Sequence, residues 1–209
     1  MRINAPASVF AEAAIFHQVN PDNAGEKTMK FLVLYSTIEG QTRKIAEAIA
    51  SHIESTGHFV ELTDANQVGS ADPGTGDGAI LCAPVHTAHY PAPFVNYVQN
   101  WRSVLNDIPT AFVSISLSIA STDEAEKAEA RNYPATLSEQ TGWKPKAVLN
   151  CAGALKYSEY DFFKRWMLKR IAAAEGGPID ARKDYELTNW TDVKRFVDDF
   201  LNELNGDKG

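Results

Sequence analysis

One segment of the sequence places hydroxyl side chains and a glycine at the start of a predicted helix. From Ser36 to Thr42 the chain reads Ser-Thr-Ile-Glu-Gly-Gln-Thr, after an apolar run and before a helical pattern. Free backbone N–H groups and the helix dipole favour an anion at such a point. Ser36, Thr37 and Thr42 add hydroxyl donors, and Gly40 lets a ligand approach the backbone. With no Lys in the segment, the pattern predicts a phosphate site built from neutral donors. An ordinary strand-to-helix turn capped by Ser and Thr is the alternative.

The elements around this segment alternate between strands and helices from Met29 onward. Short continuous apolar runs, typical of strands covered on both faces, predict strands over residues 31–35, 59–62, 79–83, 111–115 and 147–151. Helical spacing and end signals predict helices over residues 40–56, 94–105, 121–141, 160–174 and 190–204, the last capped near Asn189. Residues 65–78 are rich in Gly, Asp, Ser and Pro and are predicted mostly as loop.

This alternation predicts an α/β fold, a doubly wound, five-stranded parallel sheet with helices on both faces. In such sheets ligands bind beyond the carboxyl ends of the strands. Functional residues are therefore expected in the loops that follow Tyr35, Ala83 and Ile115.

The composition is that of an acidic globular protein. Of the 209 residues 44% are hydrophobic, and 20 Lys and Arg against 27 Asp and Glu give a formal charge of −7. These values exclude wholesale disorder, and they exclude general nucleic-acid binding, which needs a surplus of basic residues. Cys82 and Cys151 lie in apolar runs and are predicted to be buried free thiols of a cytoplasmic protein. The five His residues show no metal-ligand spacing, so no metal site is expected.

The first 28 residues differ from the rest of the chain. Pro6 and Pro21 isolate a short apolar stretch that Glu12 interrupts, which does not match a secretory signal. We expect a loosely ordered N-terminal extension at 1–28, for which an upstream start codon is one origin, with Met29-Lys30 as the functional beginning. The working domain is expected at 29–205, followed by a tail at 206–209.

Other phosphate-binding folds lack their motifs in this chain. The P-loop sequence is absent, and no strand is followed by the dinucleotide fingerprint. Ser36 and Thr37 stand where a receiver domain has an acidic cluster and where a low-molecular-weight phosphatase has a Cys. A flavodoxin-like arrangement is what remains.

The segment 36–42 resembles the phosphate-binding loop of flavodoxins, a Ser/Thr-rich turn followed by Gly, one residue and Thr. The resemblance extends over residues 30–204 and is closest to the bacterial, flavodoxin-like, menaquinone-dependent protoporphyrinogen IX dehydrogenases (protoporphyrinogen oxidases). Its motifs are Ser36-Thr37, Gly40-Gln41-Thr42, His89-Tyr90, Ala152-Gly153-Ala154-Leu155, Gly176-Gly177, Asp180, Arg182-Lys183 and Trp190. The run from Ala152 to Lys183 is the most specific part. The resemblance implies the strand order 2-1-3-4-5.

The resemblance also implies FMN as the cofactor, held by three loops. The first would grip the phosphate through Ser36, Thr37, Glu39, Gly40, Gln41 and Thr42. The second would contact the isoalloxazine ring through Pro84, Val85, His86, Thr87, His89 and Tyr90, unless it is merely the entry to the next helix. In it Tyr90 would stack on the ring, and His89 would orient the ring or donate a proton. The third, Ser116, Leu117 and Ser118, would close over the other side.

The substrate side would be lined by Gly153, Ala154, Leu155 and Tyr157, although packing explains the Gly and Ala equally well. No catalytic residue is assigned, because the chemistry belongs mainly to the flavin. The implied function is FMN-dependent oxidation of protoporphyrinogen IX to protoporphyrin IX in heme biosynthesis, with a membrane quinone as electron acceptor.

Three departures from the family pattern bear on the substrate. His86 replaces an Arg, Ser116 replaces an Asn, and residues 122–126 are acidic where the family is basic. Basic groups would help to hold the two propionates of a porphyrinogen. Two alternatives therefore stay open. One is a soluble flavodoxin-type electron carrier whose acidic surface suits a basic redox partner, and the other is a different FMN-dependent quinone oxidoreductase that takes electrons from a nicotinamide donor.

Residues 156–170 are basic and aromatic within an acidic chain. They hold five basic and two acidic residues, and Phe163, Trp166, Met167 and Ile171 share one helical face. The pattern predicts a core stripe with a solvated basic face, a peripheral contact with the cytoplasmic face of the inner membrane, or both on different faces. The sequence leaves the oligomeric state open, a homo-oligomer included.

Overall fold

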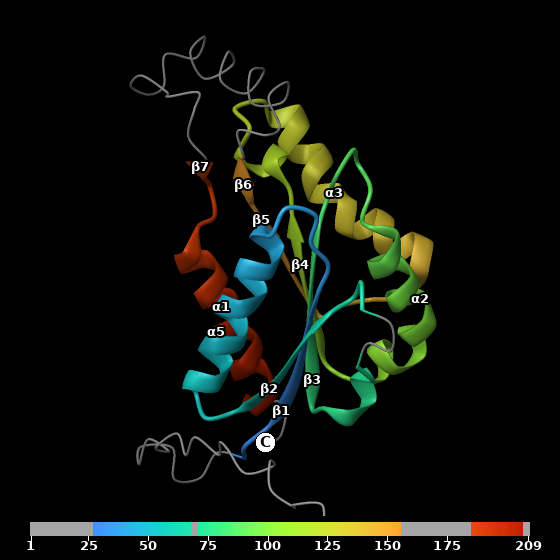
Figure 1. The fold of residues 1–209 in the computed structure, drawn as a ribbon, viewed down its shortest axis with the longest axis vertical. Helices are drawn as coiled ribbons and strands as arrows, with labels where there is room; N and C mark the ends of the chain where they lie inside the picture. Colours follow the sequence, from blue (N-terminus) through green and yellow to red (C-terminus); the bar gives the residue numbers. More distant parts are fainter. Residues whose placement is uncertain (1–26, 68–70, 156–184, 207–209) are drawn as a thin grey trace, which may run out of the picture.

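The computed structural model describes residues 27–67, 71–155 and 185–206 and shows a central sheet between two layers of helices (Figure 1). Its five parallel strands are β1 Lys30–Tyr35, β2 Phe59–Asp64, β3 Gly78–Pro84, β4 Thr110–Ile115 and β5 Ala147–Cys151. They lie in the order β2-β1-β3-β4-β5. The predicted fold class and the strand order 2-1-3-4-5 are confirmed.

Among the described residues, two helices cover each face of the sheet. Helices α1 Gln41–Ser55 and α5 Trp190–Gly206 lie on one face, and α2 Ala92–Asp107 and α3 Glu124–Thr141 lie on the other (Figure 1). Two short 3-10 helices, η2 Pro73–Thr75 and η3 Leu117–Ala120, follow β2 and β4. Helix α2 begins earlier than the predicted residue 94, because a proline is tolerated in the first turn of a helix.

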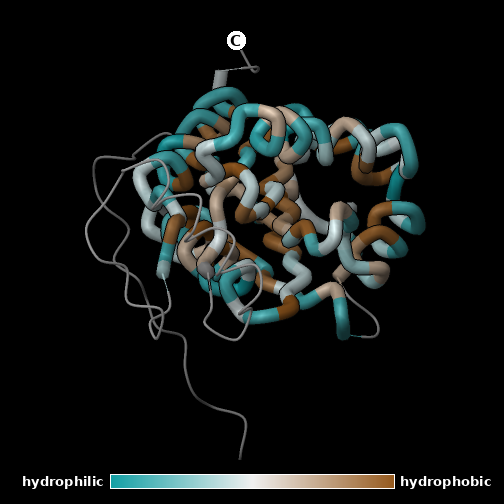
Figure 2. Tube along the Cα trace, turned by 90° about the horizontal axis from the view of Figure 1, so that it is seen from above, coloured by the Kyte–Doolittle hydropathy of each residue, from teal (hydrophilic) through white to brown (hydrophobic). Residues whose placement is uncertain are grey.

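The core divides into two clusters because successive side chains of a strand point to opposite faces. Phe31 and Val33 of β1 pack with Ile49 of α1 and Phe200 of α5. The second cluster, on the α2 side, contains Leu32, Leu34, Phe94, Phe112 and Trp143. Figure 2 shows this arrangement from above, with hydrophobic segments inside and hydrophilic ones outside. The sheet is thus a rigid base for the loops at its carboxyl edge.

Side chains and glycines fix the ends of the helices. The Asp123 carboxylate accepts hydrogen bonds from the N–H groups of Ala125 (2.9 Å) and Glu126 (3.4 Å) at the start of α3. Asn189 Oδ1 accepts from Thr191 N–H at 3.1 Å, so the predicted cap of the last helix is present. Helix α5 extends to Gly206, one residue beyond the predicted end of the domain.

A second, two-stranded antiparallel sheet was not predicted. It pairs β6 Ala154–Leu155 with β7 Tyr185–Glu186. The predicted helix at 160–174 and the basic segment at 156–170 lie outside the described residues. So do residues 1–26 of the expected extension and residues 207–209 of the expected tail.

Candidate functional site

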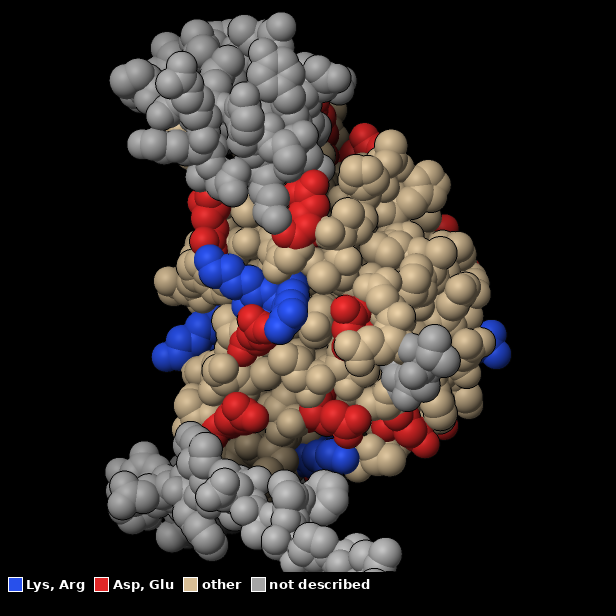
Figure 3. Space-filling view, viewed as in Figure 1, with Lys and Arg blue, Asp and Glu red and all other residues tan. Residues whose placement is uncertain are grey.

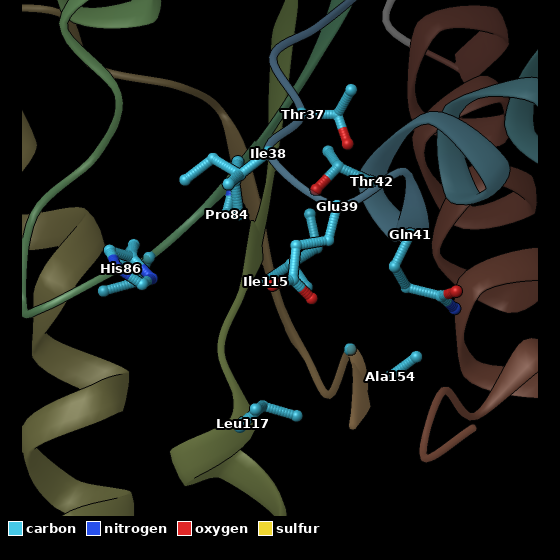
Figure 4. A pocket seen from close by; sticks show the side chains of 12 residues that line it. Thr37, Ile38, Glu39, Gln41, Thr42, Pro84, His86, Ile115, Leu117 and Ala154 are labelled. Carbon is cyan, nitrogen blue, oxygen red and sulfur yellow. The ribbon is translucent and has the colours of Figure 1, made fainter. Parts of the chain in front are cut away.

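A pocket of about 480 Å³, open to solvent, lies at the carboxyl edge of the sheet (Figure 4). It lies where β1, β3 and β4 end and α1 begins, which is the position expected for a ligand in a doubly wound sheet. It is lined by Thr37, Ile38, Glu39, Gln41, Thr42, Pro84, Val85, His86, Ile115, Leu117, Gly153 and Ala154.

The first wall of the pocket is the turn from β1 into α1. Gly40 has a φ of 92°, a left-handed conformation that favours glycine, and its N–H donates to Thr37 Oγ1 at 2.8 Å. The first bond of the helix runs from Lys44 N–H to Gly40 O at 3.1 Å. The N–H groups of residues 41–43 precede that bond and have no acceptor within the helix. Backbone N–H groups in this position are suited to bind an anion.

Two buried hydroxyl groups belong to this wall. Ser36 is 1% exposed, and its Oγ has no hydrogen-bond partner among the described residues. Thr42 is 2% exposed and lines the pocket. Leaving a buried hydroxyl unpaired costs about 1–3 kcal/mol. A ligand oxygen at the helix N-terminus would accept a hydrogen bond from the Ser36 hydroxyl and remove that cost.

The second wall comes from the loop after β3, which forms a two-residue hairpin turn. The N–H and C=O groups of His86 and His89 bond to each other at 2.9 and 3.0 Å. Thr87 and Ala88 between them have φ values of 50° and 63°, which are uncommon for residues other than glycine. Pro84, Val85 and His86 line the pocket, whereas Thr87 and His89 are exposed and do not.

Tyr90, in the same loop, is packed against the protein rather than the pocket. Its hydroxyl lies 2.8 Å from Ser114 Oγ, and its ring centroid lies 6.0 Å from that of Phe94 and 5.4 Å from that of Phe112. Burial raises the pKa of the Tyr90 phenol, so the group is neutral at physiological pH. In this arrangement Tyr90 anchors the loop.

The third loop contributes one residue to the lining. Ser116 is buried, donates its N–H to Cys151 O at 3.0 Å, and accepts the Ser118 N–H on its Oγ at 3.2 Å. These bonds shape the start of η3. Leu117 alone of the predicted residues 116–118 lines the pocket, as Figure 4 shows at its lower edge.

The last wall is the exit of β5. Gly153 and Ala154 line the pocket, and a Cβ on Gly153 would lie 3.0 Å from Ile115 Cγ2, tighter than normal packing allows. Leu155 lies in β6, and Tyr157 lies outside the described residues. Close packing with Ile115 therefore accounts for a glycine at 153.

Two lining residues, Ile38 and Ile115, were missed in the sequence. Their apolar side chains carry no chemical signal, although Ile38 lies inside the predicted phosphate segment. Ile38 is 56% exposed, an unusual degree for a large apolar residue. The pocket thus has a polar end at α1 and apolar side chains at Ile38, Ile115 and Leu117.

The acidic stretch after β4 has a structural role. Asp123 caps α3, Glu124 pairs with Lys127 at 2.8 Å, and Glu126 accepts the Ser121 hydroxyl at 2.6 Å. Carboxylates in the first turn of a helix are stabilised by its dipole. Figure 3 shows acidic side chains dispersed over one face of the molecule, with Lys and Arg gathered mainly over α1 and α5.

In the part of the chain that the structure describes, no helix combines the length and apolar character needed to cross a membrane. Among residues 27–67, 71–155 and 185–206, no three His, Cys, Asp or Glu side chains form a group that can hold a metal ion.

Comparison with known proteins agrees with this geometry. The family model described as "Flavodoxin domain" matches residues 32–182. "Protoporphyrinogen IX dehydrogenase [quinone]" of Escherichia coli (strain K12) is 31% identical over 169 residues, which are 81% of this chain and 93% of that protein. The Leishmania major protein of the same name is 34% identical over 175 residues, 82% of this chain and 74% of that protein.

Solved structures share the fold. A short-chain flavodoxin associated with a bacterial microcompartment has a TM-score of 0.53 at 11% identity, over 85% of this chain and 99% of its own. A flavodoxin from the domain Archaea has a TM-score of 0.50 at 16% identity, with the same coverage. The chain belongs to the flavodoxin-domain family, within the group of oxidoreductases named protoporphyrinogen IX dehydrogenase [quinone].

Proposed function

We propose that this protein binds FMN and uses it to oxidise protoporphyrinogen IX to protoporphyrin IX, in heme biosynthesis, with a quinone as electron acceptor. The observation that carries the proposal is the identity of 31–34% to dehydrogenases of that name over more than four fifths of the chain. The matched region contains the segments that build the carboxyl-edge pocket.

The pocket suits FMN at both ends. The unpaired Ser36 hydroxyl, Thr42 and the free N–H groups of the first turn of α1 match the acceptor oxygens of a phosphate dianion. Pro84, Val85 and Leu117 offer largely apolar surface for a flat ring. The bound flavin would supply the redox chemistry, taking electrons from the substrate and passing them to the quinone.

The residues of the chain would bind and orient the flavin and set the charge around it. Glu39 and His86 are the ionisable side chains of the lining, and they come from different loops. The His86 side chain is exposed and lines the pocket, at the position where the family pattern has an Arg. Since the acidic residues 123–126 cap and pair within α3, that departure from the family pattern has a local structural cause.

We also propose that the protein contacts the cytoplasmic face of the inner membrane peripherally through residues 156–170. The support comes from sequence and position. The segment is basic and aromatic, and β6 and β7, which precede and follow it, meet beside the pocket at Ala154. A membrane quinone would then be met close to the flavin.

The test is oxidation of protoporphyrinogen IX by the FMN-loaded protein with a soluble quinone analogue, followed by porphyrin fluorescence without oxygen. We expect porphyrin to form in proportion to enzyme and quinone, and the apoprotein is the matched control. No formation above the spontaneous rate would refute the proposal. Two separated one-electron potentials without porphyrin formation would favour the flavodoxin-type carrier, whose fold the neighbours share.

A further inference from the structure

The side chain of Gln41 is held by a segment that lies far from it in the sequence. Gln41 begins α1 and lines the pocket, yet its Nε2 donates to Thr188 Oγ1 at 2.9 Å, 147 residues away. The same nitrogen donates to Glu186 Oε1 at 3.4 Å. In Figure 4 the amide of Gln41 points away from His86 and Leu117, toward the red ribbon of the C-terminal segment. Both amide hydrogens are thus used within the protein.

Thr188 fixes the direction of these bonds. It is 8% exposed, and its hydroxyl donates to the carbonyl oxygen of Ala152 at 2.9 Å. A carbonyl only accepts, so the single hydroxyl hydrogen of Thr188 goes to Ala152, and Thr188 Oγ1 must accept from Gln41. This orients the Gln41 amide. Leu187 N–H donates to Gly153 O at 3.1 Å and attaches the segment to the same wall a second time.

Glu186 makes the corresponding contact one turn further along α1. Lys44 Nζ lies 2.5 Å from Glu186 Oε2 and 5.3 Å from the centroid of the Trp190 ring. The hydrogen bond from Lys44 holds the pKa of the Glu186 carboxyl below its usual value. Because residues three apart share a helix face, Gln41 and Lys44 present one side of α1 to residues 186–188.

We propose that residues 186–188 form a strap that fixes the first turn of α1 against the wall at residues 152–154. Gln41 then acts as a positioning residue and contacts the cofactor through its backbone, since its side-chain donors are committed to the strap. Both joined walls line the pocket, through Gln41 and Thr42 on one side and through Gly153 and Ala154 on the other. The inference rests on the proposed function, in that the FMN phosphate is placed at residues 36–42.

The test compares the binding of FMN with that of riboflavin, which lacks the phosphate. Apoprotein is titrated with each ligand, and the ratio of the two dissociation constants isolates the phosphate contribution. Thr188→Val keeps the shape of the side chain but removes both hydrogen bonds, and we expect it to weaken FMN at least about fivefold and riboflavin less than about twofold. Thr188→Ser keeps the hydroxyl and should restore the wild-type ratio. Equal losses for both ligands, or no loss, would overturn the strap.

A double-mutant cycle separates positioning from direct contact. If Gln41 acts only through Thr188, Gln41→Met and Thr188→Val together should weaken FMN no more than either change alone. Additive losses would show that the Gln41 side chain is itself a phosphate ligand, against the proposal. If Thr188→Val fails to fold, Gln41→Met takes its place in the titrations, because Gln41 is partly exposed and its replacement removes the same hydrogen bond to Thr188.

Thr42→Val in the same titrations tests the phosphate placement separately. If the preference for FMN over riboflavin falls in Thr42→Val but is unchanged in Thr188→Val, the strap is rejected. The placement of the FMN phosphate at residues 36–42 is then kept. An unchanged preference in Thr42→Val rejects both. Porphyrinogen oxidation is measured in a different assay, so a failure of the proposed reaction is distinguishable from either result.

Discussion

Replacing Ser36 with Ala should stabilise the apoprotein and weaken FMN binding at the same time. The Ser36 Oγ is buried without a partner among the described residues, so the folded apoprotein bears the cost of its desolvation. The backbone of Ser36 is anchored independently, since its N–H donates to Cys82 O at 3.0 Å. The substitution therefore removes one hydroxyl and leaves the turn in place.

The two effects have different sizes. A buried, unpaired hydroxyl costs about 1–3 kcal/mol, and the packing lost with one oxygen offsets part of the gain, so we expect the apoprotein to gain about 0.5–1 kcal/mol. That corresponds to a rise in Tm of roughly 1–4 °C for a chain of this size. A hydrogen bond to a charged phosphate contributes about 1.5–3 kcal/mol, so FMN affinity should fall about 10- to 150-fold.

The assay combines denaturant unfolding of the apoprotein with fluorescence titration of FMN. Thr110→Val is the matched control. Thr110 is also 1% exposed, but its hydroxyl has two partners: it donates to Leu105 O at 3.3 Å and accepts from Trp143 Nε1 at 3.0 Å. Thr110 begins β4 and so lies at the end of that strand away from the pocket. The control should lose about 1–3 kcal/mol of stability and keep its FMN affinity. A destabilised Ser36→Ala apoprotein with unchanged FMN affinity would refute the reasoning.

Three further results are expected. Gly40→Ala should cost about 1–2 kcal/mol in denaturant unfolding, because φ is 92° there; a stabilised protein would contradict this conformation. Tyr90→Phe should cost about 1–2 kcal/mol, since it leaves the buried Ser114 hydroxyl unpaired, and equal midpoints for the two proteins would argue against that bond. Burial raises the pKa of the Cys151 thiol to about 12, with a smaller contribution from Asp192, whereas an unfolded thiol ionises near pH 8.5. The unfolded chain thus loses this proton first as the pH rises. The free energy of unfolding should therefore fall by up to about 1.4 kcal/mol per pH unit between about pH 9 and 12. The slope of the unfolding free energy against pH should be shallower in Cys151→Ala.

The sheet was predictable because its three central strands, β1, β3 and β4, are buried on both faces. Runs such as Phe31–Tyr35 and Ala79–Ala83 leave no polar face, and only a parallel sheet between helices hides such runs. The turn from β1 into α1 was predictable too, since Gly40 and the hydroxyl residues lie within seven positions of the chain.

Other features depend on contacts that spacing does not reveal. Strands β6 and β7 are two residues long, too short for a periodic pattern. The bond between Gln41 and Thr188 joins residues 147 positions apart, and nothing in either residue's neighbourhood signals the other. The packing of Tyr90 against Phe94 and Phe112 is a property of the folded core that the loop sequence does not signal.

The pairing of β6 with β7 also bears on how this domain can diverge. Ala154 opposes Glu186 and Leu155 opposes Tyr185, so the two chain positions that precede and follow residues 156–184 lie next to each other. Lengthening a chain between fixed ends costs little, about 0.6 kcal/mol for each doubling. Insertions, deletions or exchange of that segment therefore need not disturb the five strands of the main sheet. A flavodoxin scaffold with such a junction can vary in one interchangeable segment while the turn from β1 into α1 stays the same.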